Sequence, residues 1–234
     1  AGFHLRGRGS GKPFASLDLS FDGVELLFQK FMPPLRGGAG QLSLYGNRFV
    51  ATASAGVVTA DQGGDVDVTG TSFIIPDISV KDGTPGIARV TATGSATAAL
   101  SLLDREPLRV MAKAGLPVDL AQGQVTASGT LALPLQKKVP VEMVQYHYRA
   151  EVRDVRSDVL VPGHVAEAPL LQVRGNQGEV RIQGDGALSG VPLSASWRQA
   201  VGKDASPQSR VEGEIELSAE AVAAFDLGLP PGAV

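Results

Sequence analysis

The chain of 234 residues contains no cysteine, so neither disulfide bonds nor thiolate metal sites contribute to its structure. Aromatic residues make up only 5% of it, which leaves an apolar fraction made mostly of Val, Leu and Ala. There is no run of Lys and Arg that could bind anionic lipid headgroups. The net charge of −3 is opposite in sign to the basic face with which proteins displace counterions from nucleic acid. We therefore expect no nucleic-acid partner.

Long hydrophobic runs are also lacking. The longest uncharged stretch, residues 120–136, is rich in Gln, Ser, Thr and Gly, and the hydrocarbon core of a membrane would reject it. The chain begins with Ala1 and Gly2 and has neither a starting methionine nor a signal-peptide pattern. We expect it to be one segment of a larger protein, with any membrane anchor outside it.

The residues that usually carry catalysis or bind metals are few. The histidines are His4, His147 and His164. None of them is spaced i, i+4 from another histidine, so no metal site is predicted. Two groups of acids are Asp61, Asp65 and Asp67, and Glu212, Glu214 and Glu216. The first departs from the spacing of known calcium loops, and the second is typical of the solvated face of a strand. We predict no catalytic residue, no metal and no cofactor.

What the chain does contain is glycine and alternation. With 29 glycines and 15 prolines it is rich in turns. Four short segments alternate apolar and polar residues between two glycines, at residues 40–46, 64–70, 123–129 and 178–184. Period-two alternation is typical of a strand with one apolar and one polar face. The irregular spacing of the four segments favours a long antiparallel sheet laid down strand after strand over a strict solenoid.

The same alternation organises most of the chain. We predict leading strands in residues 1–30, hairpins in 31–94, a pair of short helices in 96–116, strands in 118–217 and a short helix in 218–228, all within one unit covering residues 1–234. The helices are expected near 97–104, 107–115 and 219–227. Pro107 suits a first helical turn, Gly115 suits a helix end, and Ser218 suits an N-cap. The fold class is therefore mainly β, with two or three short helices.

With the strands laid out, the chain resembles the AsmA-like family of bacterial envelope proteins, a branch of the bridge-like lipid-transfer group, over roughly residues 31–229. The resemblance rests on glycine and alternation patterns, which contain no catalytic residue. The matching segments are residues 33–44 (PPLRGGAGQLSL), 47–49 (NRF), 75–76 (IP), 102–108 (LLDREPL), 131–135 (LALPL) and 184–197 (GDGALSGVPLSASW).

The resemblance implies an elongated, curved antiparallel sheet whose concave face is an open, taco-like groove for acyl chains. It also implies a periplasmic location, an inner-membrane anchor and further β segments outside this chain. The expected function is lipid transport between the inner and outer membranes, which contributes to envelope integrity and outer-membrane biogenesis, with phospholipid or another acyl lipid as partner.

Two other readings stay open. A structural β scaffold, such as an adhesin-like envelope protein, would show similar alternation around a closed, dry core. A carbohydrate-active enzyme would need acids and aromatic residues that converge in a cleft, and the shortage of aromatics and histidines argues against it. For the lipid conduit, the residues expected to line the groove are Leu42, Leu44, Val66, Val68, Val125, Ala127, Leu131, Leu133, Val180, Ile182, Leu193, Ala195, Ile215 and Leu217.

Overall fold

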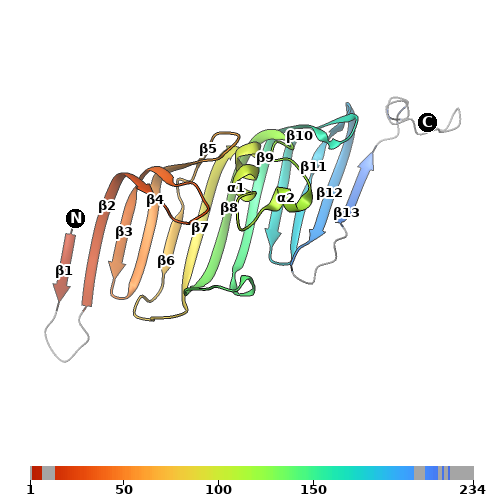
Figure 1. Cartoon of the computed structure of the whole chain (residues 1–234). Coiled ribbons are helices and arrows are strands. Elements are labelled where there is room, and N and C mark those ends of the chain that lie inside the picture. The colour runs from red at the N-terminus through yellow and green to blue at the C-terminus, as the bar shows by residue number, and fades with distance from the viewer. Residues whose placement is uncertain (1, 7–13, 203–208, 216–217, 219–220, 222–234) are drawn as a thin grey trace.

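The chain forms one antiparallel β-sheet, as Figure 1 shows. The computed structural model describes residues 2–6, 14–202, 209–215, 218 and 221. Twelve of the strands follow one path across the sheet and β6 lies beside that path. At about 4.8 Å between neighbouring strands, the sheet extends roughly 50 Å from β1 to β13. The predicted mainly-β fold is therefore confirmed.

The strands are β1 (Gly2–Arg6), β2 (Phe14–Leu26), β3 (Leu35–Tyr45), β4 (Arg48–Thr59), β5 (Asp65–Asp67), β6 (Ser72–Ile75), β7 (Thr84–Ser95), β8 (Gln122–Leu135), β9 (Gln145–Val161), β10 (His164–Asn176), β11 (Glu179–Leu188), β12 (Val191–Ala200) and β13 (Ser209–Ile215). Two α-helices, α1 (Ala96–Leu103) and α2 (Val110–Ala114), and a 3-10 helix, η1 (Val141–Met143), complete the described elements.

Strand order in space follows strand order in the chain. The sequence β1-β2-β3-β4 continues through β5 to β7 and then runs without interruption to β13. Two short strands, β5 and β6, share the position between β4 and β7, and each of them pairs with both neighbours. The sequence predicted this strand-after-strand layout, because short polar turns such as the one at Gly46 and Asn47 join antiparallel neighbours directly.

The register places apolar side chains on one face across many strands. Residues directly opposite each other in an antiparallel pair share a face, so a chain of such pairs can be followed across the sheet. We call one such chain the central apolar row. It consists of Ala92, Ala127, Ala150, Val173, Ile182, Trp197 and Val211, on β7 to β13. We refer to this side as the apolar face and to the other as the polar face.

Irregularities of the ladder gather along one edge of the sheet. Register shifts occur in β2 after Phe21, in β3 between Arg36 and Gly40, in β8 next to Gly123 and twice in the first half of β10. All of these strand ends lie at the edge where β7 passes into α1, which we call the helix edge. Bulges bend a strand and increase its twist. The ends of β2, β3 and β4 accordingly curve over at this edge (Figure 1).

The two predicted helices in the middle of the chain form, with one correction. α1 begins where expected, with the Ser95 hydroxyl accepting a hydrogen bond from the Ala98 amide at 3.0 Å. α2 ends at Gly115 as predicted, but it begins at Val110 and not at Pro107. The amides of Leu108 and Arg109 bond back to the Arg105 carbonyl in a separate turn. Arg109 then has a left-handed backbone, with φ 47°, so the second helix can begin only after it.

Two further expectations concern the ends of the strand region. The strands predicted in residues 118–217 are interrupted, because residues 141–143 form η1 and the next strand begins only at Gln145. The third expected helix, 219–227, lies outside the described residues except for Ala221. The amide of Ala221 donates to the Ser218 hydroxyl at 3.2 Å, which is the bond of an N-cap.

The glycines that flank the four alternating segments have different structural roles. Gly46, Gly64 and Gly70 have positive φ and turn the chain. Gly40 instead lies within β3, where an added Cβ would overlap the Thr52 carbonyl oxygen and approach the Phe21 ring to 2.7 Å. Gly178, by contrast, has open space, with its nearest neighbour 3.4 Å from the position of a Cβ.

This difference predicts opposite responses to one substitution. Gly40→Ala should lower the free energy of unfolding by about 1–3 kcal/mol, because backbone of β4 must move to admit the methyl group. Gly178→Ala should change it by less than about 0.5 kcal/mol. Urea denaturation followed by circular dichroism measures both. Equal effects of the two substitutions would contradict the tight approach at Gly40.

Candidate functional site

The register brings the predicted lining residues onto the apolar face. Leu42 and Leu44 of β3 lie opposite Ala51 and Phe49 of β4, and the same face continues through β6 and β7 to β8. Of the fourteen residues expected to line the groove, only Leu217 is not placed, since it lies outside the described residues. The residues placed on this face are Leu42, Leu44, Val66, Val68, Val125, Ala127, Leu131, Leu133, Val180, Ile182, Leu193, Ala195 and Ile215.

Over most of its area the apolar face has no second layer among the described residues. Val66, Ala60 and Ala98 form a small core, where α1 packs on the sheet beside Val68 and Ala92. Elsewhere the lining side chains are half-buried, except that Val125 is buried and Ile215 is exposed. No large side chain in the described part of the chain is fully buried. The arrangement differs from a closed sandwich, in which two sheets bury each other's apolar faces.

Large side chains on this face cover glycines of the neighbouring strand. The Tyr148 ring lies over Gly175, and the Leu171 side chain lies over Gly184. In the same way Leu135 and Phe73 cover Gly86, at 2.7 and 3.0 Å from the position a Cβ would take. A large group laid across a strand glycine fills the gap in the pleated surface. These large side chains therefore lie flat along the sheet and do not stand out from it. The apolar face is smoother for that reason than the number of its large residues suggests.

Sequence reasoning missed several residues of this face. Val152, Leu171 and Val173 lie opposite one another or opposite predicted lining residues. Simple alternation identifies Val152, which follows Tyr148 and Ala150 at the period of two. It does not identify the β10 residues, because the shift between Glu167 and Leu170 changes which residues of that strand share a face.

Tyr146 and Tyr148 are the aromatic pair of β9 on this face. Their rings are stacked, with centroids 6.5 Å apart. Burial raises the pKa of the Tyr148 phenol above its ordinary value, with a smaller contribution from Tyr146. The surroundings of Tyr148 on the apolar face therefore disfavour the charged form of a side chain.

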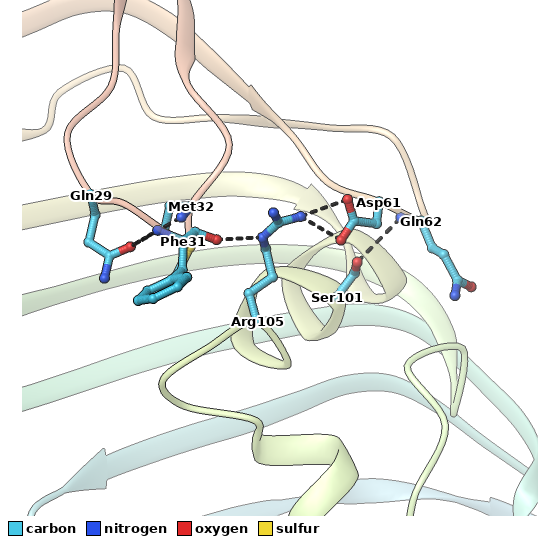
Figure 2. A network of polar contacts seen from close by, with 7 residues as sticks. All are labelled: Gln29, Phe31, Met32, Asp61, Gln62, Ser101 and Arg105. Atoms are coloured by element: carbon cyan, nitrogen blue, oxygen red, sulfur yellow. Dashed lines mark hydrogen bonds and ion pairs between the residues drawn. The ribbon is translucent and has the colours of Figure 1, made fainter.

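A polar clamp holds two loops against the end of α1 (Figure 2). The Arg105 guanidinium donates to both carboxylate oxygens of Asp61, at 2.7 and 2.5 Å, and its Nε donates to the Phe31 carbonyl at 2.7 Å. The Ser101 hydroxyl accepts from the Gln62 amide at 3.3 Å. One arginine thereby joins the β2–β3 loop, the β4–β5 loop and the helix pair at the helix edge.

The three aspartates that were considered as a calcium loop each bind to another residue of the chain. Asp61 pairs with Arg105, and Asp65 accepts a hydrogen bond from the Thr59 hydroxyl at 2.7 Å. Asp67 accepts from the Thr69 amide at 2.7 Å, and its hydrogen bonding to Thr69 lowers the pKa of the carboxyl. No group of three or more His, Asp or Glu within the described ranges is placed to hold a metal ion.

A shallow hollow with a volume of about 590 Å³ lies at the bulged ends of β9, β10 and β11. Its lining includes Glu167, whose carboxylate is paired with Arg156, and Asp185, which accepts from the Ser194 hydroxyl at 2.5 Å. No aromatic side chain lines it. The convergent acids and aromatics that a sugar-cleaving site needs are not gathered here.

Comparisons with known proteins found nothing: no family model, no curated protein and no solved structure matches the chain. Within the described residues, neither helix has the length or the apolar character required to span a bilayer.

The raised pKa of Tyr148 can be tested by titration. Burial favours the neutral phenol in the folded state, so this contribution to stability is complete below the unfolded pKa, about 10, and is lost as the pH rises through the higher folded value. Absorbance at 295 nm should therefore show one tyrosine that ionises after the others, and Tyr148→Phe should remove that last step. If Tyr148→Phe removes an earlier step, the Tyr148 site is not desolvated.

The clamp predicts a local effect of Arg105→Ala. The loop at residues 27–34 should lose its anchor, so the amides of Phe31 and Met32 should exchange hydrogen faster. The global free energy of unfolding should change by no more than about 1 kcal/mol, because the ion pair is partly exposed. Lys113→Ala, at an exposed residue of α2, is the control. Unchanged exchange in the loop after Arg105→Ala would show that something else holds it.

Proposed function

We propose that this chain is a segment of a lipid-transport conduit, and that its apolar face shields the acyl chains of phospholipid or another acyl lipid. The observation that carries the proposal is the continuous apolar face from β3 to β13, which no second layer closes among the described residues. An exposed apolar surface of this extent on a folded protein marks a binding site for an apolar partner.

The energetics suit a conduit better than a pocket. Each methylene withdrawn from water contributes about 0.8 kcal/mol, so an acyl chain crossing water unshielded costs on the order of 10 kcal/mol. A path needs only to lower this cost along its length. The side chains of the central apolar row are mostly small or branched, and the glycine gaps beside them are covered by Tyr148 and Leu171. A smooth wall lets a chain slide without a deep trap.

The edges of the sheet fit a segment that is continued by others. β1 and β13 each have a partner strand on one side only, among the described residues. β13 also presents Val211 and Ile215, both exposed, on the apolar face. An open edge of this kind is a template for pairing with a further strand. We propose adjoining β segments as partners, so that the apolar face is extended beyond this chain.

The cellular setting of the proposal follows from the resemblance to the AsmA-like family. The conduit works in the bacterial periplasm, is held at the inner membrane by an anchor outside this chain, and supplies lipid for outer-membrane biogenesis. No residue of the chain is assigned a catalytic role and no cofactor is required, because shielding an acyl chain breaks no bond.

Two neighbouring residues of β11 provide a matched test. Ile182 is half-buried on the apolar face, whereas Gln183 is exposed on the polar face. Ile182→Asp should reduce phospholipid recovered with the purified protein by about tenfold or more, because a carboxylate beside the acyl chain costs more than the 1.4 kcal/mol that corresponds to a factor of ten. Gln183→Asp should leave lipid recovery unchanged. Mass spectrometry of extracted lipid measures both.

Leu133→Asp on β8 gives a second, independent position on the same face, and it is preferable to Val125→Asp because Val125 is buried. Circular dichroism should show the same β signal for all variants. If wild-type protein carries no lipid, or if the apolar-face variants carry as much as Gln183→Asp, the conduit is wrong and a structural β scaffold remains as the alternative.

A further inference from the structure

A row of arginines crosses the polar face, on the side away from the proposed lipid path. The pairs Arg149–Arg174, Arg174–Arg181, Arg181–Arg198 and Arg198–Arg210 are each directly opposite in the register. We call these five residues, on the adjacent strands β9 to β13, the arginine row. Each immediately precedes or follows a member of the central apolar row in the sequence, which places the arginine row on the opposite face.

Such a row opposes folding unless something offsets it, since like charges directly opposite each other across two strands are destabilising. At its far end the compensation is present: Arg198 lies 3.5 Å from a Glu179 oxygen, and Arg210 lies 2.5 Å from a Glu212 oxygen. Among the described residues, the side chain of Arg149 donates only to the Ser128 hydroxyl, at 3.2 Å.

The centre of the row is uncompensated. Within the described part of the chain, no hydrogen bond or ion pair is made by the side chains of Arg174 and Arg181. The Nε of Arg181 is moreover buried without an acceptor. Positions at which a sequence breaks a local rule without an evident gain in stability are expected to be functional.

The choice of residue points to a specific kind of anion. Between Lys138 and Lys203 there is no other lysine, so apart from two histidines every basic residue there is an arginine. A guanidinium presents two parallel N–H donors that match the two oxygens of a carboxylate or a phosphate, whereas a lysine acts as a point charge. A row made only of arginine is therefore suited to several carboxylate or phosphate groups that follow one another along a chain.

The residues beside the arginine row favour a linear anionic polymer as the partner over a flat anionic surface. Acidic residues flank it on both sides, with Glu151 and Glu212 in the neighbouring register row and Glu179 on the other side. An anionic bilayer presents a continuous negative surface, which these carboxylates would repel. A single extended polymer can follow the arginines and leave the acids in water.

The same face lacks the groups that hold nucleic-acid bases. The Phe, Tyr and Trp residues of β9 to β13 are Tyr146, Tyr148 and Trp197, and the register puts all of them on the apolar face. Single-stranded nucleic acid is bound by stacking its bases on such rings. The strand spacing of about 4.8 Å sets the distance between the backbones of neighbouring arginines in the row. This distance is close to the length of one sugar unit in an extended polysaccharide.

We propose that the arginine row binds a linear acidic polysaccharide that carries one carboxylate per sugar and lies across β9 to β13. The polymer runs perpendicular to the strands, and those of its carboxylates that face the sheet pair with guanidinium groups of the row. Binding relieves the mutual repulsion of the arginines and supplies acceptors for Arg174 and Arg181. The site is separate from the lipid path and does not depend on it.

The test uses an oligogalacturonate of seven sugars and isothermal titration calorimetry on the whole chain at low ionic strength. The wild-type protein should bind it, and added salt should weaken the binding. The double variant Arg174→Gln/Arg181→Gln should bind more than about tenfold more weakly, because two charge-assisted pairs are lost. Arg153→Gln is the control, since Arg153 lies on the same face outside the row and is already paired with Glu151. It should bind within about twofold of wild type.

A measurement of stability shows whether the double variant loses binding because it is misfolded. Removing the two central charges relieves repulsion, so the urea midpoint of the double variant should not fall below that of wild type. Failure of the wild-type protein to bind oligogalacturonate, or equal loss in Arg153→Gln and the double variant, overturns the proposal. Equal or tighter binding of phosphatidylglycerol vesicles or of oligo(dT) that is lost in the double variant would also overturn it, because the occupant of the arginine row would then be a membrane or a nucleic acid.

Discussion

Every feature of this molecule depends on a register that keeps apolar side chains on one face from strand to strand. A slip of one residue would move the whole apolar set of a strand to the other face. The bulges are therefore confined to the helix edge, where the ladder can shift without disturbing the central apolar row. The glycines within strands serve the same constraint, because they admit Phe21, Tyr148 and Leu171 across the sheet without opening gaps.

The two faces have separate chemistry because strand residues alternate. Ile182 and Arg181 are neighbours in the sequence, yet one belongs to the central apolar row and the other to the arginine row. An apolar partner on one face and an anionic partner on the other would therefore not compete. The helix pair and the Arg105 clamp add a third element, since they close over the apolar face only at the helix edge.

Much of this could be predicted from the sequence, and the limits have physical causes. Period-two alternation fixed the face of Leu42 or Ile182 because parity within a strand is local. The first helix was also predictable, since its Ser95 cap is local. The start of α2 was not, because the left-handed backbone of Arg109 decides it, and nothing in the sequence marks that conformation. The arginine row was invisible for a related reason: its members are distant in the chain, and only the register aligns them.

The central claim is that one face of a single open sheet holds acyl chains. Its most direct test is photocrosslinking to phospholipid from a photoreactive side chain placed in turn at each residue of 193–198 in β12, a stretch without glycine. The account predicts an alternating pattern, with lipid adducts at 193, 195 and 197 and none at 194, 196 and 198. Uniform labelling at all six positions, or labelling of the polar-face positions alone, would contradict it.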